Sequence, residues 1–271
     1  MLESLSKIPC KIHYVWMGGA PKSGMILKCI ESWKKYCPGY EIIEWNEDNF
    51  DIHCCKYIEE AYNAKKWAFV ADAVRVYLLK EYGGIYFDSD VELFNSPNDI
   101  FEDANAVFGF DDHFELSTGV LASVAHHPIY EMLWDKYNKS TFLGVEFEDT
   151  INTKLTFIVM DYIEKRRAIN KNYKFKDIKI YSVDFFNGEG HDAKCTSPIF
   201  AVHHFSGSWK IKKQLTFLQY LFFKIERKVL RILSQFIGNK TYLKMDWYIE
   251  HKIRKQTVKN IANGARIYKT L

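Results

Sequence analysis

The sequence predicts an α/β fold with a central, mostly parallel sheet flanked by helices, and three observations favour that class. An apolar run over residues 8–16 ends at a glycine pair, as a buried strand followed by a loop would. Residues 24–37 then read as a helix and residues 40–45 as a second strand, so a βαβ unit opens the chain. The third observation is a long helical pattern over residues 67–81 that leads through another glycine pair into a β-prone stretch.

The helical pattern over residues 67–81 carries polar groups along one edge. Its apolar residues recur at the i, i+3, i+4 spacing of an amphipathic helix. Asp72 and Arg75 are three residues apart, so they share one face of the predicted helix. Gly83 and Gly84 follow, and glycine is typical of a helix C-terminus. We therefore expect the helix to end at this pair.

Two aspartates follow the β-prone stretch over residues 85–87. In a strand, alternate residues share a face, so Asp88 and Asp90 can point at one spot if strand geometry persists there. Two carboxylates at one spot suit a divalent cation that keeps open positions for phosphate oxygens. The alternative is a solvated strand end that carries no ligand.

The second half of the chain predicts further strands and helices. The predicted strands are residues 106–110, 116–122 and 178–181, and the predicted helices are residues 128–137 and 150–167. Pro128 would lie in the first turn of its helix, where proline is tolerated. A last apolar stretch, residues 198–202, leads directly into His203 and His204.

Length and composition indicate one domain with an appendage, in a cytoplasmic protein. The chain has 271 residues, 48% of them apolar and 16% aromatic, which is enough to build a substantial core. Its six cysteines form no C-x-x-C pair and follow no apolar leader, so we expect reduced thiols. No apolar run approaches the roughly 18 residues that cross a bilayer. A membrane-anchored protein is therefore disfavoured.

The charge is divided unevenly along the chain. Residues 210–271 hold fifteen Lys and Arg residues against three acidic ones, whereas residues 1–209 hold twenty-two against thirty-one. This shift places a boundary after Trp209, with a main domain over residues 1–209 and a basic helical extension over residues 210–271. The basic part does not indicate nucleic acid binding, because its aromatic residues form no known binding motif and the acidic part would be repelled.

The basic extension has an amphipathic pattern that allows two interpretations. Apolar residues from Leu215 to Phe236 fall on one side of a helix, and basic residues from Lys213 to Arg231 fall on the other. In one interpretation the apolar side docks on the main domain and the basic side is solvated. In the other the segment rests on an anionic membrane, where each basic residue adds about 1 kcal/mol.

The central residues resemble glycosyltransferase family 32, whose members carry a DXD motif. The shared pattern is D-x-x-R, from Asp72 to Arg75, followed by G-G-I-Y-x-D-x-D, which ends at Asp88 and Asp90. The family holds capsular-polysaccharide transferases, initiating mannosyltransferases and the catalytic domains of clostridial toxins. The resemblance implies a GT-A-like (Rossmann-like) catalytic domain over residues 1–209.

Two flanking motifs extend the resemblance. The opening I-P-x-x-I-H-x-x-W ends at Trp16, which the family would place against the nucleotide base, although a core tryptophan is the alternative. The closing H-H-x-x-x-S-W offers His204 as a metal ligand, with His203 as the competing choice. The resemblance places Ser208 and Trp209 near the diphosphate. Packing or indirect roles for both histidines are the alternative.

The resemblance implies a metal-dependent glycosyltransferase that retains anomeric configuration. Asp88 and Asp90 would hold Mn²⁺ or Mg²⁺ as a Lewis acid. Asp72 would accept hydrogen bonds from sugar hydroxyls, and Arg75 would hold Asp72 or contact the sugar or phosphate.

The implied donor is a nucleotide-diphosphate sugar, with a UDP-sugar favoured. The implied acceptor is a hydroxyl of a glycan, with a lipid-linked glycan as one form, in capsule or O-antigen synthesis at the inner face of a bacterial membrane. A pseudoenzyme that only binds a nucleotide sugar and a toxin-like protein glycosyltransferase are the alternatives.

Overall fold

The computed structural model describes residues 8–111, 115–142, 150–164, 171–186 and 200–204. Apart from Thr150, these residues belong to one compact unit made of residues 1–142 and 151–210. The basic extension and the boundary predicted after Trp209 lie outside the described residues, so both stay predictions. Within the described ranges, no helix combines the length and the apolar character needed to cross a membrane.

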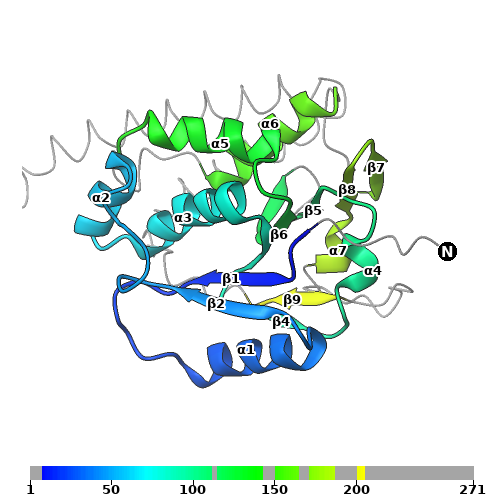
Figure 1. The fold of residues 1–271 in the computed structure, drawn as a ribbon, viewed down its shortest axis with the longest axis horizontal. Coiled ribbons are helices and arrows are strands. Elements are labelled where there is room, and N and C mark those ends of the chain that lie inside the picture. Colours follow the sequence, from blue (N-terminus) through cyan, green and yellow to red (C-terminus); the bar gives the residue numbers. More distant parts are fainter. Residues whose placement is uncertain (1–7, 112–114, 143–149, 165–170, 187–199, 205–271) are drawn as a thin grey trace, which may run out of the picture. The chain divides into compact units, whose positions relative to one another are not determined.

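A seven-stranded mixed sheet forms the centre of this unit (Figure 1). In spatial order its strands are β2 (Glu41–Trp45), β1 (Lys11–Val15), β3 (Gly84–Phe87), β6 (Leu116–Ser123), β5 (Ala106–Phe110), β8 (Ile178–Tyr181) and β7 (Tyr173–Phe175). β1 is parallel to β2 and β3, and β5 is parallel to β8. Only β6 and β7 run against the others, since each is antiparallel to its neighbours. The predicted α/β class, with a mostly parallel sheet, is confirmed.

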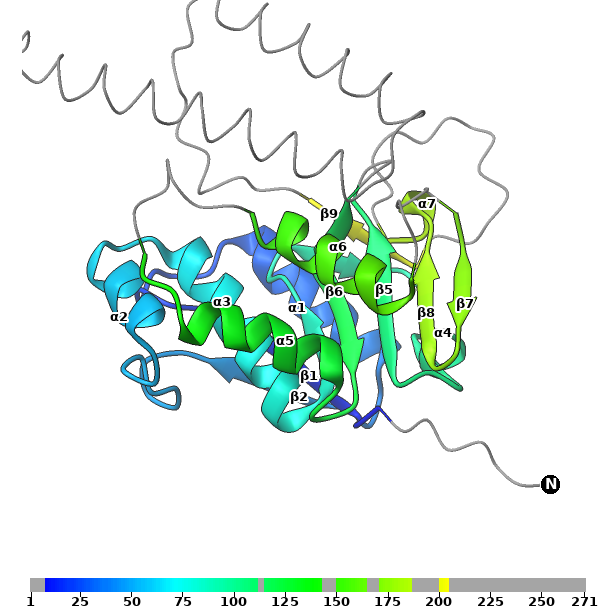
Figure 2. The same ribbon diagram turned by 90° about the horizontal axis from the view of Figure 1, so that it is seen from above.

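Helices cover both faces of the sheet (Figures 1 and 2). One face carries α1 (Gly24–Tyr36), and the other carries α2 (Lys56–Asn63), α3 (Trp67–Tyr82), α5 (Pro128–Asn138) and α6 (Ile151–Tyr162). The short α4 (Asn98–Phe101) and α7 (Val183–Phe186) complete the helices of the described ranges. Strand β3 shows how the sheet divides the core: Ile85 and Phe87 pack toward α1, and Tyr86 packs toward α3.

The glycine pair between α3 and β3 is required by close backbone packing. Gly83 caps the helix, with its N–H donating to the Leu79 carbonyl at 3.1 Å, and it has a φ of +61°. A Cβ at Gly83 would come within 2.5 Å of the Ala125 nitrogen, and one at Gly84 within 2.8 Å of the Lys11 carbonyl oxygen. The pair therefore lets the chain leave the helix and enter the sheet beside β1.

A second, two-stranded sheet lies beyond the end of β3, and the sequence did not predict it. It pairs β4 (Val91–Leu93) antiparallel with β9 (Ala201–His203), in a register that matches Val91 with His203. Strand geometry ends at Phe87: residues 88–90 form a turn in which the Val91 N–H donates to the Asp88 carbonyl at 2.9 Å. This pairing brings the distant His203 beside the two aspartates.

Candidate active site

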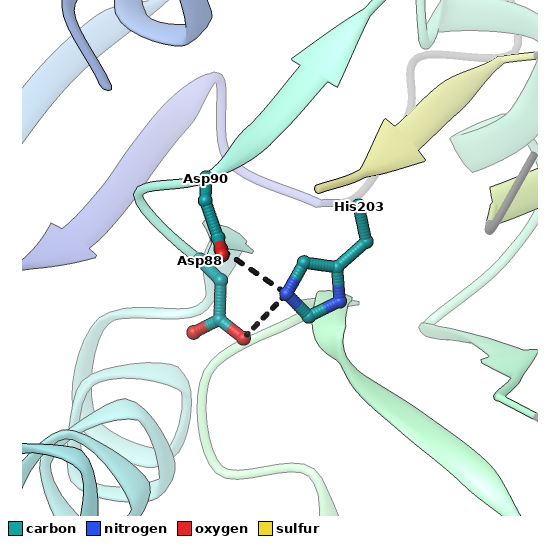
Figure 3. Close-up of side chains that lie close together, drawn as sticks. All are labelled: Asp88, Asp90 and His203. Carbon is teal, nitrogen blue, oxygen red and sulfur yellow. Dashed lines mark ion pairs between the residues drawn. The ribbon is translucent and has the colours of Figure 1, made fainter. Parts of the chain in front are cut away.

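Asp88, Asp90 and His203 converge at one point of the fold (Figure 3). His203 Nε2 lies 3.1 Å from Asp90 Oδ1 and 3.8 Å from Asp88 Oδ2. One ligand atom from each residue lies within 4.8 Å of the other two. Among the described residues, this is the only group of three or more acidic, histidine or cysteine side chains with that spacing.

The donor set of this cluster fits a divalent cation. Carboxylate oxygens are the ligands that Mg²⁺ and Mn²⁺ favour, and imidazole nitrogen is also a common ligand of transition metals. Burial lowers the pKa of His203, but its hydrogen bond to Asp90 and the charge of Asp88 raise it more, so the pKa lies above its usual value. The site therefore attracts positive charge, and a cation would compete with the proton on His203.

His204 points to a different partner. Its Nε2 lies 2.9 Å from Glu92 Oε2, and Lys28 Nζ lies 2.8 Å from the other oxygen of the same carboxylate. Neighbouring residues at a strand end project to opposite sides, so His203 and His204 cannot both face the aspartates. The geometry thus favours His203, the competing choice, over His204 as the imidazole ligand.

Arg75 is buried beneath the cluster, with 4% of its surface exposed, and binds protein groups through all of its donors. Its Nη2 lies 2.8 Å from Asp72 Oδ1 and 3.1 Å from Asp88 Oδ1. Its Nη1 donates to Asp88 Oδ2 at 3.3 Å and to the Thr118 carbonyl at 2.8 Å, and its Nε donates to the Ala71 carbonyl at 3.3 Å. A guanidinium has five N–H donors, so this arrangement uses every one.

The Arg75 contacts leave the guanidinium no donor for a sugar or phosphate. Burial lowers its pKa, but the adjacent Asp88 and Asp72, together with neighbouring tyrosines, raise it more, so the group stays charged. Of the two roles expected for Arg75, the geometry favours that of holding Asp72 in place, and it shows Asp88 as a second carboxylate that Arg75 holds. The Asp72 side chain remains 20% exposed, so it is accessible to a ligand.

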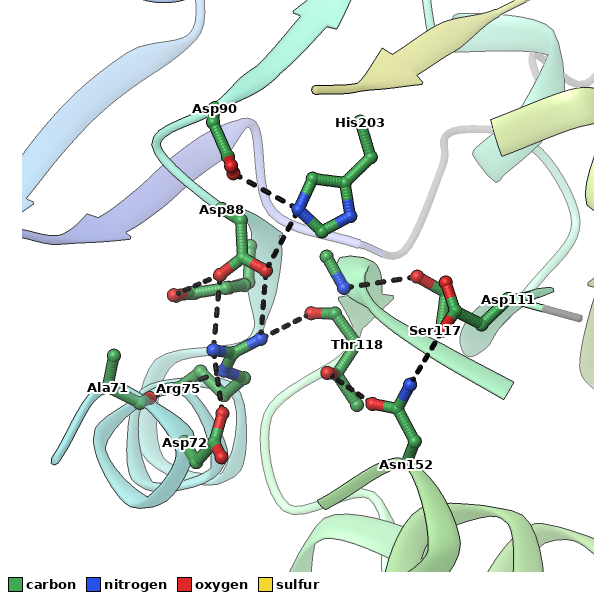
Figure 4. A network of polar contacts seen from close by, with 12 residues as sticks. Ala71, Asp72, Arg75, Asp88, Asp90, Asp111, Ser117, Thr118, Asn152 and His203 are labelled. Atoms are coloured by element: carbon green, nitrogen blue, oxygen red, sulfur yellow. Dashed lines mark hydrogen bonds and ion pairs between the residues drawn. The ribbon is translucent and has the colours of Figure 1, made fainter. Parts of the chain in front are cut away.

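Several further side chains join this polar network (Figure 4). The Tyr86 hydroxyl donates to Asp88 Oδ1 at 3.1 Å, and the Arg75 guanidinium lies 4.7 Å from the Tyr86 ring centroid. On the other side, the Thr118 hydroxyl donates to Asn152 Oδ1 at 2.8 Å, and Asn152 Nδ2 donates to an Asp111 oxygen at 3.1 Å.

Sequence reasoning missed these participants for different reasons. Tyr86 lies inside the recognised G-G-I-Y-x-D-x-D pattern, which was a usable signal. Asn152 comes from the first turn of α6, and no local pattern links it to the aspartates. Its role emerges only when β6 and α6 pack together.

Trp16 lies directly after β1, at its carboxyl end, as expected. Its indole N–H donates to the Ala20 carbonyl at 2.7 Å, and Lys22 Nζ lies 5.4 Å from its ring centroid. The ring is partly buried against the α1 side of the core, so it keeps surface for a ligand while also packing. Ser208 and Trp209 lie outside the described residues.

Comparison with known proteins agrees with this site. Residues 25–107 match a protein family described as "Glycosyltransferase sugar-binding region containing DXD motif". This span includes Asp72, Arg75, Asp88 and Asp90. No curated protein matches the chain significantly.

Solved structures of glycosyltransferases are similar to the chain. PaToxG glycosyltransferase is 17% identical with a TM-score of 0.45, over 58% of this chain and 70% of that one. A glycosyltransferase involved in glycosylation of the major capsid of PBCV-1 is 14% identical with a TM-score of 0.38, over 65% and 84%. GlyE of Streptococcus pneumoniae TIGR4 is 13% identical with a TM-score of 0.36, over 57% and 44%.

The family match covers Asp88 and Asp90 of the cluster, and also helix α3, which carries Asp72 and Arg75. The mixed, mostly parallel sheet flanked by helices agrees with the GT-A-like architecture that the sequence resemblance implied. The expected enzyme class, a glycosyltransferase, is confirmed at this level: residues 25–107 are similar to the sugar-binding region of DXD-containing glycosyltransferases.

Proposed function

We propose that this enzyme transfers a sugar from a nucleotide-diphosphate donor to a hydroxyl group of a glycan acceptor. The observation that carries the proposal is the convergence of Asp88, Asp90 and His203, in a chain whose DXD region matches a glycosyltransferase family. A departing nucleoside diphosphate gains negative charge. A cation held by the ligand atoms of Asp88, Asp90 and His203 would stabilise that charge.

The chain's residues divide the work between binding charge and holding geometry. A divalent cation held by Asp88, Asp90 and His203 would supply charge neutralisation for the departing diphosphate. Arg75 fixes Asp88 through two donors and fixes one oxygen of Asp72. Asp72, which is acceptor-only when ionised, would receive hydrogen bonds from hydroxyls of the donor sugar.

Finer features of the proposal rest on the sequence. Membership of glycosyltransferase family 32, retention of configuration and a UDP-sugar donor follow from the resemblance in the central and flanking motifs. We place the base on Trp16 and the diphosphate beside Ser208 and Trp209. The catalytic domain would span residues 1–209, and the basic extension over residues 210–271 would rest on the cytoplasmic membrane of a bacterium near a lipid-linked acceptor for capsule or O-antigen.

A donor screen tests the proposed reaction. The purified full chain is incubated with Mn²⁺ and a panel of UDP- and GDP-sugars, and released nucleoside diphosphate and glycosylated products are identified by mass spectrometry. Release from one donor, with sugar found on a glycan acceptor, supports the proposal. Tight donor binding without release would indicate a nucleotide-sugar-binding pseudoenzyme, and sugar found on a protein would indicate a toxin-like transferase.

A further inference from the structure

His203 reaches the aspartates from a strand that has little pairing of its own. Strand β9 has three residues, and within the part of the chain that the structure describes it pairs only with the three residues of β4. Two-stranded ladders are at best marginally stable in water. The position of the imidazole therefore depends on what holds β4 and β9 from outside the ladder.

The far edge of β4 is held by side chains of α1. The Trp33 indole N–H donates to the Val91 carbonyl at 2.8 Å, and the Leu93 N–H donates to the Ser32 hydroxyl at 2.9 Å. These bonds satisfy backbone groups that a third strand would otherwise pair. Helix α1 thus anchors β4 on one edge while β9 occupies the other.

The end of β9 is held by a carboxylate that lies between a lysine and a histidine. Glu92 is 7% exposed, and its two oxygens meet Lys28 Nζ at 2.8 Å and His204 Nε2 at 2.9 Å. The His204 N–H also donates to the Asp90 carbonyl at 3.0 Å. His204, the residue directly after His203, is therefore held through both its backbone and its side chain.

Gly119, in strand β6, limits where the His203 imidazole can lie. A Cβ at Gly119 would lie 2.9 Å from His203 Nδ1, 3.0 Å from its Cε1 and 3.3 Å from Asp88 Oδ2. The Gly119 carbonyl also accepts a hydrogen bond from the Asp88 N–H at 2.8 Å. The Gly119 backbone is not left-handed, so an alanine there crowds two of the three candidate ligands without backbone strain.

We propose that Gly119 and the Lys28–Glu92–His204 cluster are positioning elements that place His203 against Asp88 and Asp90. This inference rests on the proposed cation site and deepens it. None of the four residues needs to touch the cation or the donor. Their effect is to hold the imidazole of a short, distant strand at bonding distance from the carboxylates.

Binding of Mn²⁺ to the full chain tests this inference without any turnover. Free Mn²⁺ is measured by its electron paramagnetic resonance signal during titration, and nitrogen coupling to bound Mn²⁺ is measured by pulsed methods. Changes around metal ligands typically weaken metal affinity by about 10- to 100-fold, and we expect that range for Gly119→Ala and His204→Ala. His204→Gln keeps a donor toward Glu92, so it should restore most of the affinity.

Matched variants separate positioning from general damage. Gly24→Ala adds a methyl group in open space, and Glu31→Gln removes an exposed ion pair on α1, so neither should change Mn²⁺ affinity. Nitrogen coupling should persist in Mn²⁺-loaded His204→Ala and be lost in His203→Ala. Nitrogen coupling that persists in His203→Ala and is lost in His204→Ala would make His204 the direct ligand and overturn the inference.

The outcomes also separate this inference from the proposed function. If the wild type binds Mn²⁺ and His203→Ala weakens that binding, but Gly119→Ala and His204→Ala bind like the wild type, only the positioning roles are refuted. If the wild type binds no Mn²⁺, the cation site and the positioning roles fall together. If Gly119→Ala does not fold, the His204→Ala and His204→Gln pair still decides the result.

Discussion

At the scale of single residues, Arg75 organises the site. It is a buried cation that satisfies two carboxylates and two backbone carbonyls at once. Its planar fork supplies donors in the directions that these acceptors require, which a point charge cannot do. The helix face that carries Asp72 and Arg75 was predictable from their spacing, but the use of every donor was not, because Thr118 comes from another strand.

Arg75→Lys tests this role. Lysine keeps the charge but has three donors, so at least two of the five contacts that the Arg75 guanidinium makes with buried acceptors are lost. We expect a loss of about 2–5 kcal/mol in the free energy of unfolding, measured with urea, together with loss of turnover. The control is Lys56→Arg in the exposed pair with Glu60, which should change neither. Full activity in Arg75→Lys would mean that the guanidinium fork is dispensable.

Asp90→Asn tests the acidic side of the cluster. The change removes one anionic ligand and keeps the side-chain size, so turnover should be lost while near-UV circular dichroism stays that of the wild type. Excess EDTA should likewise abolish turnover of the wild type, and added Mn²⁺ or Mg²⁺ should restore it. Undiminished turnover in EDTA would contradict a divalent cation at Asp88, Asp90 and His203.

Trp16→Ala tests whether the ring at the end of β1 binds a base. Stacking of a base on an aromatic ring contributes about 1–3 kcal/mol, so nucleotide affinity should fall by about that amount. The ring is only partly buried, so the fold should persist. Calorimetric titration with nucleoside diphosphates measures the affinity, and thermal unfolding measures the stability. Unchanged affinity with a large loss of stability would make Trp16 a core residue.

At the scale of elements, the sequence predicted those with a clear period. The strand and helix patterns of the opening βαβ unit correspond to β1, α1 and β2, and the pattern over residues 67–81 corresponds to α3. These elements have the apolar spacing that burial against a sheet imposes. The glycine pair was also informative, since only glycine fits at Gly83 and Gly84.

The elements that complete the site were not predictable in the same way. Strands β4 and β9 have three residues each, which is too short for a period, and they pair across about a hundred residues of sequence. The sequence predicted that extended geometry would align Asp88 and Asp90, but residues 88–90 form a turn. The aspartates converge because β4 and β9 form beside them, which no local pattern encodes.

His13 gives a test of how the central strands are joined. The Trp45 indole donates to its Nδ1 at 3.0 Å, so its Nε2 carries the hydrogen that is donated to the Gly83 carbonyl at 2.9 Å. Burial lowers the pKa of His13 to about 4; the Gly83 bond and Glu41 raise it slightly, and Lys11 lowers it. Protonation would place a second hydrogen against the Trp45 N–H.

The sign of the pH effect follows from this lowered pKa. The folded-state pKa lies below the unfolded value near 6.5, so the stabilising contribution is present above pH 6.5 and is lost as the pH falls toward 4. We expect a loss of up to about 3 kcal/mol from this group over that range. Urea unfolding at several pH values should give a flatter dependence for His13→Gln than for the wild type. Equal slopes would show that His13 does not control the effect.

At the scale of the whole molecule, charged residues are distributed unevenly along the chain, and the candidate active site does not account for this. Residues 210–271 carry a net charge of +12 and residues 1–209 one of −9. The acidic part includes the candidate active site, whereas the basic part lies outside the described residues. We expect a strongly basic segment to bind an anionic partner, and a membrane that contains anionic lipids is one such partner.

Sedimentation with liposomes tests the membrane proposal for the basic extension. The full chain should bind vesicles that contain anionic lipid, fail to bind neutral vesicles, and dissociate as salt screens the charges. Each basic residue near the surface contributes about 1 kcal/mol, so removing four should weaken binding by several orders of magnitude. The four changed to glutamine are Lys224, Arg227, Lys228 and Arg231. The matched control changes four exposed lysines of the described part, Lys34, Lys35, Lys56 and Lys139, and should bind like the wild type. If both quadruple variants partition equally with the wild type, the segment does not bind membranes, and its apolar side is left to pack against protein.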